Sequence, residues 1–499
     1  IEPSPFAHLF QFHSHNFIMT IMQVSGECFP YSKTGGLADM VGALSKALAA
    51  RGTQVQVVTP LYRGIARKFK EIQPMDWALD LEMGDKMVSG KLYTLNPQPN
   101  LTIYFIEQPD YFDRPGIYGE KSEDYEDNSE RFLFFSKAAT NLARYLTDAP
   151  DIVHAHDWQA GMVPAMIQHQ HMRGGWYPAP TTCFTIHNLA YQGNFPADSF
   201  SYTNLPSDYF GPHGVEFYKQ VSFLKSGLIF ADQLTTVSPK YAKEILTEEF
   251  ACGMGGVLNA RAESLCGILN GVDYEDWNTL QNPNLDATYT VGKMDGKALQ
   301  KKKLQTMLGL PCEPNVPLLG LVGRLVDQKG MDLLLPALHA TLDRRFQFVL
   351  LGSGMPFYQE GFKRLARDYP DQVAVTIGYD NSLAHKIEAA SDFFVMPSKF
   401  EPCGLNQLYS LKYGSVPIVR AVGGLDDSII GLSESAHVAT GIKFNDYAVT
   451  ALEAALNEAF DLYEDQESYK KIRKNGMLKD FSWERTSLEY LDLYDSLLQ

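Results

Sequence analysis

The stretch Ile18–Asp39, IMTIMQVSGECFPYSKTGGLAD, contains an apolar run, a short loop and the start of a helix. The run Ile18–Ser25 predicts a buried strand, and the pair Gly35 and Gly36 precedes the helix. Such glycines let backbone N–H groups approach a phosphate or sugar oxygen, and Lys33 adds a positive charge. A glycine turn with a solvated lysine explains the same residues equally well. The loop matches neither the dinucleotide fingerprint nor the phosphate loop of nucleotide hydrolases.

Short apolar runs of strand-forming residues alternate with longer amphipathic segments along the chain. This alternation favours βαβ units on a parallel sheet whose two faces are covered by helices. The pattern restarts after the irregular stretch Gly271–Asp286, so we predict two such sheets. The further strands expected in the first sheet are Gln54–Thr59, Leu101–Glu107, Asp151–His156, Thr181–Ile186 and Gln233–Ser238. Those expected in the second sheet are Leu318–Gly323, Phe346–Leu351, Gln372–Ile377, Asp392–Met396 and Val416–Val419.

The length of 499 residues also favours two domains of similar size, because a single hydrophobic core rarely grows to that extent. We predict an N-terminal extension over residues 1–17, a first domain over 18–268, a second domain over 269–481 and a C-terminal helix over 482–499. The histidines of the extension are not interpreted as metal ligands. A cleft between the two domains is then available for a ligand.

The formal net charge of −16 opposes binding to nucleic acid or to an anionic membrane, because a negative field repels polyanions. An anionic small ligand then requires a local cluster of Lys or Arg. The six cysteines are scattered without a metal-binding spacing and predict a reducing compartment. No apolar run is long enough to cross a bilayer, and no secretory signal pattern is evident, so we expect a soluble intracellular protein.

Polar residues follow two neighbouring predicted strands, at the end where ligands of open parallel sheets bind. His154 and His156 end one strand and Asp157 follows them, whereas His187 and Asn188 follow the next strand. The first two histidines are compatible with a metal, but no third ligand occurs at a standard spacing, so hydrogen bonding is favoured. Asp, His and Asn suit recognition of sugar hydroxyls, each of which both donates and accepts.

The segment Gly323–Gly330, GRLVDQKG, follows the first strand of the second sheet. Arg324 and Lys329 can flank a bound diphosphate with a planar fork and a point charge, and each charge-assisted hydrogen bond contributes roughly 1.5–3 kcal/mol. This is the local positive cluster that an anionic ligand requires. The alternative is a surface loop whose charges are solvated.

The segment Pro397–Gln407, PSKFEPCGLNQ, also joins a strand end to a helix. The backbone amides of Cys403–Leu405 can bind an anionic group, and Glu401 can bind hydroxyls or stabilise positive charge at a sugar carbon. The alternative for Glu401 is an acidic residue that merely favours the helix start. Cys403 is interpreted as a small residue in a tight turn, since no histidine lies beside it in the sequence.

Taken in order, seven motifs between Met19 and Trp483 resemble the bacterial glycogen synthase and plant starch synthase family. They are KTGGLAD (33–39), HAHDW (154–158), IHNLAYQG (186–193), ILNGVD (268–273), GRLVDQKG (323–330), PSKFEPCGL (397–405) and GGLDDS (423–428). An ordered set is far more specific than any single motif. The resemblance implies an α/β protein of the GT-B fold, in which two Rossmann-like domains face a deep cleft and the C-terminal helix crosses back to the first domain.

The resemblance also implies an activity, namely retaining transfer of glucose from ADP-glucose or UDP-glucose to the non-reducing end of an α-1,4-glucan, without a metal or other cofactor. It assigns catalytic roles to Lys33, Asp157, His187, Arg324, Lys329 and Glu401. It assigns substrate contacts to Glu27, Gly35, Gly36, Asn188, Asn270, Tyr379, Cys403, Gly404, Leu405 and Asn406. Among these, Arg324 and Lys329 stabilise the diphosphate as its negative charge grows, and Tyr379 stacks on the base.

Three positions depart from the commonest pattern of that family. Gly26 stands where Ser is usual, Thr279 where Pro is usual and Asn406 where Thr is usual. None of these changes removes a charge, but Asn406 leaves the choice between ADP and UDP open. The alternatives are a glucan-binding protein without activity, a sucrose- or trehalose-type transferase, and a nicotinamide oxidoreductase, which lacks its glycine fingerprint here. We expect the bacterial cytosol as the location, with the plastid stroma as the alternative.

Overall fold

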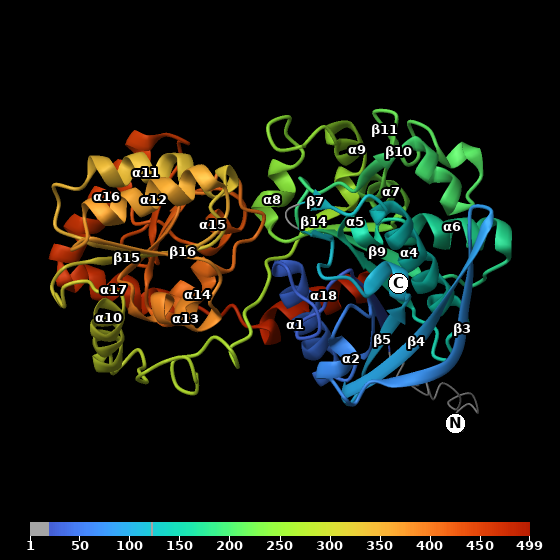
Figure 1. The fold of residues 1–499 in the computed structure, drawn as a ribbon, viewed down its shortest axis with the longest axis horizontal. Helices are drawn as coiled ribbons and strands as arrows, with labels where there is room; N and C mark the ends of the chain where they lie inside the picture. Colours follow the sequence, from blue (N-terminus) through green and yellow to red (C-terminus); the bar gives the residue numbers. More distant parts are fainter. Residues whose placement is uncertain (1–18, 121–122) are drawn as a thin grey trace, which may run out of the picture.

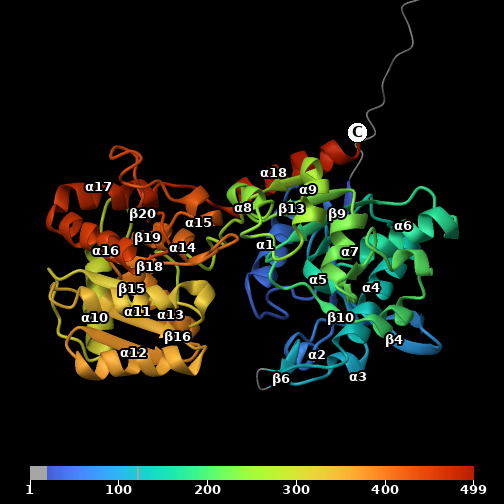
Figure 2. The ribbon, with the colours of Figure 1, turned by 90° about the horizontal axis from the view of Figure 1, so that it is seen from above.

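The computed structural model of the chain describes residues 19–120 and 123–499 and consists of two α/β lobes that lie side by side (Figures 1 and 2). Each lobe has its own sheet and its own hydrophobic core. The predicted extension over residues 1–17 lies outside the described residues. Within the described part of the chain, no helix combines the length and the apolar character that a bilayer span requires.

The first lobe contains a nine-stranded sheet in the order β14-β13-β9-β8-β1-β2-β5-β4-β3. The seven strands from β14 to β5 are parallel, and six of them are the predicted ones, with ends that differ by no more than two residues. These seven are β1 (Thr20–Val24), β2 (Gln54–Pro60), β5 (Leu101–Glu107), β8 (Ile152–His156), β9 (Thr181–Ile186), β13 (Gln233–Thr236) and β14 (Leu265–Gly267).

An antiparallel hairpin at the edge of this sheet was not predicted from the sequence. It consists of β3 (Gln73–Met83) and β4 (Lys86–Gln98), and β4 pairs antiparallel with β5. Along β3, Leu79, Leu81 and Met83 are buried, whereas the residues between them are exposed. This alternation is expected of a strand that has one face in water. The first sheet is therefore mixed rather than wholly parallel.

The helices of the first lobe share the core of its sheet. They are α1 (Gly36–Ala50), α2 (Ile65–Lys68), α3 (Pro109–Phe112), α4 (Asn128–Tyr145), α5 (Asp157–Ala160), α6 (Val163–Gly174), α7 (Phe223–Phe230), α8 (Pro239–Glu244) and α9 (Gly255–Ala260). Two small sheets lie outside the main one and contain β6 (Gly119–Glu120), β7 (Glu123–Asp124), β10 (Asn194–Pro196), β11 (Glu216–Phe217) and β12 (Gln220–Ser222). In α1, buried Leu37, Met40, Val41, Leu44 and Leu48 recur at the spacing of one helix face.

The second lobe contains a six-stranded parallel sheet in the order β17-β16-β15-β18-β19-β20. Its strands are β15 (Leu318–Val322), β16 (Gln347–Gly352), β17 (Val373–Ile377), β18 (Phe393–Met396), β19 (Val416–Arg420) and β20 (Ile442–Phe444). The helices around it are α10 (Asp295–Met307), α11 (Met331–Ala340), α12 (Pro356–Asp368), α13 (Asn381–Ala390), α14 (Asn406–Tyr413), α15 (Gly423–Ser428), α16 (Val449–Glu464) and α17 (Gln466–Met477). The five predicted strands are confirmed, and β20 is additional.

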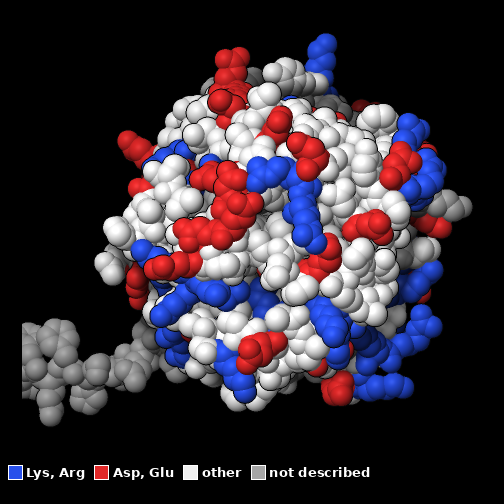
Figure 3. Space-filling view, turned by 90° about the vertical axis from the view of Figure 1, so that its left-hand side faces the viewer, with Lys and Arg blue, Asp and Glu red and all other residues white. Residues whose placement is uncertain are grey.

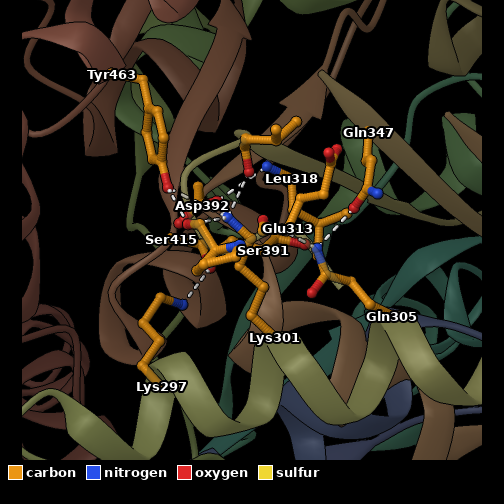
Figure 4. A network of polar contacts seen from close by, with 12 residues as sticks. Lys297, Lys301, Gln305, Glu313, Leu318, Gln347, Ser391, Asp392, Ser415 and Tyr463 are labelled. Atoms are coloured by element: carbon orange, nitrogen blue, oxygen red, sulfur yellow. Dashed lines mark hydrogen bonds and ion pairs between the residues drawn. The ribbon is translucent and has the colours of Figure 1, made fainter. Parts of the chain in front are cut away.

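A buried polar network holds α10 on the second sheet (Figure 4). Lys301 pairs with Asp392 at 2.6 Å, and Lys297, one turn earlier, donates to two backbone carbonyls and to the hydroxyl of Ser415. Asp392 directly precedes β18 and also accepts the amide of Leu318, at 2.9 Å, at the start of β15. The network therefore lies at the amino ends of the strands. Because ligands of parallel sheets bind at the carboxyl ends, we interpret the network as structural.

The chain crosses between the lobes twice, and the two crossings lie side by side. The amide of Val272 in the first crossing donates to the carbonyl of Phe481 in the second, at 2.7 Å. After the second crossing, α18 (Trp483–Leu497) packs on the first lobe (Figure 2). Tyr490 and Tyr494 of this helix belong to the core of the first lobe. The last helix thus links the two lobes covalently and completes the core of the first.

The outer face of the second lobe carries both signs of charge. Figure 3 shows many Lys and Arg side chains over the lower part of this face and a mixture of acidic and basic side chains above them. Exposed ion pairs such as Arg344–Asp461, at 2.8 Å, and Arg345–Glu313, at 2.6 Å, belong to this lobe. Side chains of both signs thus share this face, although the net charge of the chain is −16. Local groups consequently decide whether an anion can bind in the cleft.

Candidate active site

The predicted site segments follow strand ends that face the space between the lobes. A pocket of about 210 Å³ lies there, lined by residues of α1, the first crossing and α14. Of the predicted site residues, those that line this pocket are Lys33, Gly36, Asn270, Tyr379 and Leu405. The other predicted residues do not line it. We call the residues after β1, β8 and β9 the first wall, and the residues after β15 and β18 the second wall.

Glu27 organises the loop of the first wall that follows β1. Its carboxylate accepts the backbone amides of Thr34 and, at 3.4 Å, Gly35. It also accepts the hydroxyls of Thr34, at 2.5 Å, and Tyr118, at 2.7 Å. Because both oxygens are occupied by the protein, Glu27 fixes the shape of the glycine loop. Glu27 thus supports the loop, and its predicted substrate contact stays a prediction.

Lys33 and Gly36 lie where the same loop meets the second lobe. The ammonium group of Lys33 contacts the carboxylate of Asp39 at 2.8 Å, and its side chain is 41% exposed. A Cβ atom on Gly36 would lie 3.7 Å from the side chain of Leu405 in the second lobe. The loop is therefore a contact between the lobes, and an anion near Lys33 competes only with an exposed ion pair.

Asp157 and His187 join the ends of β8 and β9. Asp157 has a positive φ of 54°, and its carboxylate accepts the amide of His187 at 2.7 Å. Burial raises the pKa of Asp157 to about 7, although the backbone amides of His187 and Asn188 oppose this rise. Burial also lowers the pKa of His187 to about 3. The side chain of Asn188, in contrast, accepts the amide of Ala190 at 3.0 Å and stabilises its own turn.

His154 and His156 are completely buried and hydrogen-bonded, as predicted. His154 contacts the hydroxyl of Tyr494 at 2.7 Å, and His156 contacts Gln23 at 2.6 Å and His187 at 3.1 Å. Among the described residues, no group of three or more His, Cys, Asp and Glu side chains is arranged to hold a metal ion. The connections to Gln23 and Tyr494 were not predicted, because they join residues far apart in the sequence.

The second wall holds most of the charge of the site. Lys329 pairs with Glu401 at 2.5 Å, and the hydroxyl of Ser398 donates to the same carboxylate oxygen at 2.9 Å. Glu401 lies in a loop and does not begin a helix, so the helix-start alternative is wrong. Arg324 donates to the hydroxyl of Tyr191 in the first lobe at 3.0 Å. The two predicted cations thus have different partners, one within the second wall and one across the cleft.

The loop from Cys403 to Asn406 leads into α14. Burial raises the pKa of the Cys403 thiol to about 12, so this residue is no nucleophile. Gly404 has a φ of +70°, and a Cβ there would lie 2.5 Å from the side chain of Gln407. The side chain of Asn406 donates to the carbonyl of Val322 at 2.7 Å and so holds the start of α14 beside β15. No side chain caps α14, which leaves its first amides available to a ligand.

Asn270 and Tyr379 have groups that a ligand in the pocket can contact. The side-chain oxygen of Asn270 is buried without a hydrogen-bond partner in the described part of the chain, although buried polar atoms are normally paired. The backbone amide of Asn270 contacts the thiol of Cys403. The ring of Tyr379 is 83% exposed and follows Gly378, whose φ is +142°. An exposed ring on a pocket wall suits stacking with a planar base.

A set of contacts between α8 and α15 joins the lobes near Glu401, and the sequence did not predict it. The carboxylate of Glu244 in α8 accepts the amide of Gly423 at 3.1 Å. The amide of Lys240 donates to Asp427 at 2.7 Å. The backbone amide of Gly424 donates to the carbonyl of Glu401 at 3.1 Å. The first lobe therefore contacts, through α15, the loop that carries Glu401.

Two family models match the chain, namely the starch synthase catalytic domain over residues 20–260 and the glycosyl transferases group 1 over residues 310–478. A glycogen synthase of Anaeromyxobacter sp. (strain Fw109-5) is 46% identical over 96% of this chain and 99% of its own length. A glycogen synthase of Syntrophotalea carbinolica is 43% identical over 95% of this chain and 98% of its own length.

The same similarity holds for a solved structure. The catalytic domain of starch synthase IV from Arabidopsis thaliana, bound to ADP and acarbose, aligns with a TM-score of 0.87 and 33% identity, over 96% of this chain and 99% of that one. The predicted GT-B fold is thereby confirmed. The two α/β lobes, the ordered motifs and these relatives together lead to one conclusion: the chain belongs to the glycogen synthase and starch synthase family and is a glucosyltransferase.

Proposed function

We propose that the chain transfers glucose from a nucleoside diphosphate glucose to the non-reducing end of an α-1,4-glucan, with retention of configuration at the anomeric carbon. The observation that carries this proposal is the second wall, where Lys329 and Glu401 are paired at 2.5 Å in the segments that precede α11 and the uncapped start of α14. Opposite charges at such a site suit a reaction in which negative charge grows on a leaving diphosphate and positive charge grows on the sugar.

Arg324 and Lys329 are the proposed contacts of the diphosphate. Each cation now interacts with a protein group, Tyr191 for Arg324 and Glu401 for Lys329. When a diphosphate binds, both cations are expected to contact its oxygens, because it offers Arg324 a charged partner in place of a neutral hydroxyl and offers Lys329 more negative charge than a single carboxylate. The free amides at the start of α14, near Gly404 and Leu405, supply further donors.

Glu401, Asp157 and His187 are the proposed contacts of the transferred glucose. Glu401 is 5% exposed and is held by Lys329 and Ser398, so its charge can act on a positive sugar carbon at a fixed position. His187 is neutral at physiological pH because burial lowers its pKa to about 3. A neutral imidazole can accept a hydrogen bond from a sugar hydroxyl. Asp157 supports this arrangement by holding the backbone of His187.

The pocket that Lys33, Asn270 and Tyr379 line is proposed to hold the nucleotide. Tyr379 would stack on the base, and Lys33 and Asn270 would contact the polar part of the donor. The starch synthase IV structure contains ADP and acarbose, which supports a nucleoside diphosphate and a glucan-like sugar for this chain as well. Both ADP-glucose and UDP-glucose remain candidate donors. We propose the bacterial cytosol as the location, because the similar glycogen synthases are bacterial.

We further propose that the transfer needs no metal ion. Arg324 and Lys329 can provide the positive charge that a divalent cation supplies in other transferases. A glucan-binding protein without activity is the second candidate, but binding alone does not require two cations at a diphosphate site. A transferase with another acceptor is the third candidate. Sucrose-phosphate synthase from Thermosynechococcus elongatus has a similar fold, with a TM-score of 0.60 at 18% identity, and this likeness concerns the fold alone.

The experiment that tests this function is transfer of labelled glucose onto glycogen by the purified full chain. ADP-glucose and UDP-glucose are compared as donors, each with and without excess EDTA. We expect transfer from at least one donor and an unchanged rate in EDTA. No transfer from either donor would refute the enzymatic proposal, and loss of transfer in EDTA would refute the metal-free part.

A further inference from the structure

A chain of buried hydrogen bonds connects the C-terminal helix α18 to His187 in the first wall. The hydroxyl of Tyr494 contacts the side-chain amide nitrogen of Gln23 at 3.2 Å. The amide oxygen of Gln23 contacts Nε2 of His156 at 2.6 Å, and Nδ1 of His156 contacts Nε2 of His187 at 3.1 Å. Tyr494 and Gln23 are 471 positions apart in the sequence, so this connection exists only in the folded chain.

The direction of each hydrogen bond near Tyr494 follows from its neighbours. The structure places the side-chain nitrogen of Gln23, which can only donate, at the hydroxyl oxygen of Tyr494. The proton of that hydroxyl is therefore directed to Nδ1 of His154, at 2.7 Å, and Nε2 of His154 carries the proton shared with the hydroxyl of Thr185, at 2.5 Å. Nδ1 of a neutral His154 then has no proton, so it accepts the proton of the Tyr494 hydroxyl. The oxygen of Tyr494 is left as an acceptor.

The remaining directions follow from that acceptor. With its NH2 group at Tyr494, Gln23 turns its oxygen toward His156. An amide oxygen has no proton to give, so Nε2 of His156 carries the proton of that bond. Nδ1 of the neutral His156 therefore accepts, and Nε2 of His187 must donate. His187 is thus fixed as the tautomer with the proton on Nε2 and a free lone pair on Nδ1.

Burial supports this order of proton positions. Tyr494, Gln23, His154 and His156 are completely buried, so water cannot substitute for a lost partner. Burial also lowers the pKa of His156 well below its usual value and keeps the ring neutral. His187 alone is 9% exposed, and Nδ1 has no hydrogen-bond partner among the described residues. Among the ring nitrogens of His154, His156 and His187, Nδ1 of His187 is therefore the one that a ligand can reach.

We propose that Tyr494 is a positioning residue for His187. Through Gln23 and His156 it keeps the ring proton of His187 on Nε2, so that Nδ1 can accept a hydrogen bond from a hydroxyl group of the transferred sugar. This role rests on the proposed function, because the sugar is the ligand that benefits. The proton order itself does not depend on that function. The proposal gives the C-terminal helix α18 a role in positioning His187, in addition to its packing on the first lobe.

The experiment compares the full chain with the variant Tyr494→Phe, each labelled with ¹⁵N in histidine. Long-range ¹H–¹⁵N spectra report which ring nitrogen carries the proton, and the variant His187→Asn identifies the signal of His187. We expect one tautomer, protonated on Nε2, in the original chain. Tyr494→Phe removes the acceptor for Gln23, so the amide can turn over and His187 should show both tautomers.

Tyr490→Phe is the matched control. Tyr490 lies one turn earlier on α18, is completely buried, and its hydroxyl is without a hydrogen-bond partner in the described part of the chain. Its removal should leave the His187 tautomer unchanged. Gln23→Met interrupts the chain at the next residue and should release the tautomer as Tyr494→Phe does. A glucosyl transfer assay of the same proteins should show kcat lowered about tenfold by Tyr494→Phe and a donor KM within about twofold.

A single Nε2-protonated tautomer of His187 in both Tyr494→Phe and Gln23→Met would overturn the proposal. A change in Tyr490→Phe equal to that in Tyr494→Phe would overturn it as well, because the effect would then come from packing. If the original chain transfers no glucose, the proposed function fails, yet the spectra still decide whether Tyr494 sets the proton position. The two failures are therefore distinguishable.

Discussion

The two walls of the cleft are built in different ways. In the first wall, apart from the exposed Lys33, the functional side chains are buried and held by hydrogen bonds: the carboxylate of Asp157 accepts the amide of His187, and the ring of His187 contacts His156. In the second wall, the cationic side chains are partly exposed. Lys329 pairs with Glu401 in the same wall, and Arg324 contacts the first lobe across the cleft. The first wall is therefore prearranged, whereas the cations of the second wall have to exchange partners when a diphosphate binds.

This difference has a physical reason. A buried neutral network keeps its geometry because each lost partner leaves an unpaired polar atom. An exposed cation contributes little to stability, since solvent screens it, and is free to move toward a ligand. Substitutions in the second wall should therefore affect turnover most, and substitutions in the first wall should affect stability and its pH dependence.

The largest expected effect is on turnover in the second wall. Arg324→Ala and Lys329→Ala should each lower kcat by about 10²–10⁴-fold, because each removes a donor from the negative charge of the transition state. The melting temperature of Arg324→Ala should stay close to that of the original chain, whereas Lys329→Ala should also lose stability because it leaves the buried carboxylate of Glu401 without its cation. Steady-state kinetics with the preferred donor and thermal unfolding measure the two quantities.

Lys363→Ala is the control for these variants. Lys363 also lies in the second lobe, but it pairs with Glu360 on the exposed face of α12, at 2.8 Å. Its removal should change kcat by less than about twofold, as expected for a surface ion pair. Near-normal turnover of both Arg324→Ala and Lys329→Ala would remove the basis of the comparison between the walls.

The next effect concerns Asp157 in the first wall and the pH dependence of stability. Burial raises the pKa of Asp157 from 3.8 to about 7 in the folded chain. The folded state therefore binds the carboxyl proton of Asp157 more tightly than the unfolded state does. The stability that this proton contributes is complete below pH 3.8 and is lost as the pH rises to 7. The Asn side chain of the variant Asp157→Asn cannot ionise. As the pH rises from 3.8 to 7, the free energy of unfolding of this variant minus that of the original chain should therefore increase by on the order of 4 kcal/mol.

Urea unfolding of both proteins between pH 4 and 8 measures this difference. Asp198→Asn serves as the control, because Asp198 is exposed and should show no such trend. A constant difference between Asp157→Asn and the original chain across the range would mean that the first wall is less buried than its geometry indicates.

A smaller effect is expected where the first lobe supports the second wall. Gly423 has a φ of +44°, and a Cβ there would lie 2.0 Å from the carbonyl oxygen of Glu401. Gly423→Ala should lower the free energy of unfolding by roughly 1–3 kcal/mol and displace the Glu401 loop. Gly256→Ala, where a Cβ meets nothing within 4 Å, should be neutral or slightly stabilising. Equal stability of the two variants would contradict the tight packing of α15 on the Glu401 loop.

The smallest effect is expected for the contact between Glu244 and Gly423. Glu244→Ala removes a carboxylate that accepts the Gly423 amide, and kcat/KM should fall about tenfold, the loss of one hydrogen bond to a charged group. Glu248→Ala changes an exposed residue of the following segment and should leave kcat/KM unchanged. If both variants behave alike, contacts between the lobes do not position the second wall.

Much of the fold could be predicted because its strands are local apolar runs. Leu101–Glu107 and Thr181–Ile186 coincide with β5 and β9. The hairpin of β3 and β4 was missed, since its half-exposed strands mix polar and apolar residues and lack a continuous apolar run. The sequence LDLEM at 79–83 carries the alternation that could have identified β3.

The site could be predicted only as far as its segments carry motifs. The motifs identified Lys329 and Glu401, but their direct pairing at 2.5 Å joins residues 72 positions apart and has no local signal. The same holds for Glu244 with Gly423 and for Tyr494 with Gln23. The side chains of Glu27 and Asn188 also hold the backbone of their own loops, through contacts with residues seven and two positions away, and their substrate contacts stay predictions. The pairings of Lys329, Glu244 and Tyr494 depend on contacts between residues far apart in the sequence, which spacing in the sequence does not encode.

The central claim is that both walls contact one donor molecule, and binding of ADP measured by isothermal titration calorimetry tests it most directly. The proteins compared are the original chain, Lys33→Ala for the first wall and Lys329→Ala for the second. The two-wall account predicts that each substitution weakens ADP binding by about tenfold or more, as expected when a charge-assisted contact is lost. Unchanged ADP affinity in either variant would contradict it, because that wall would then not contact the donor.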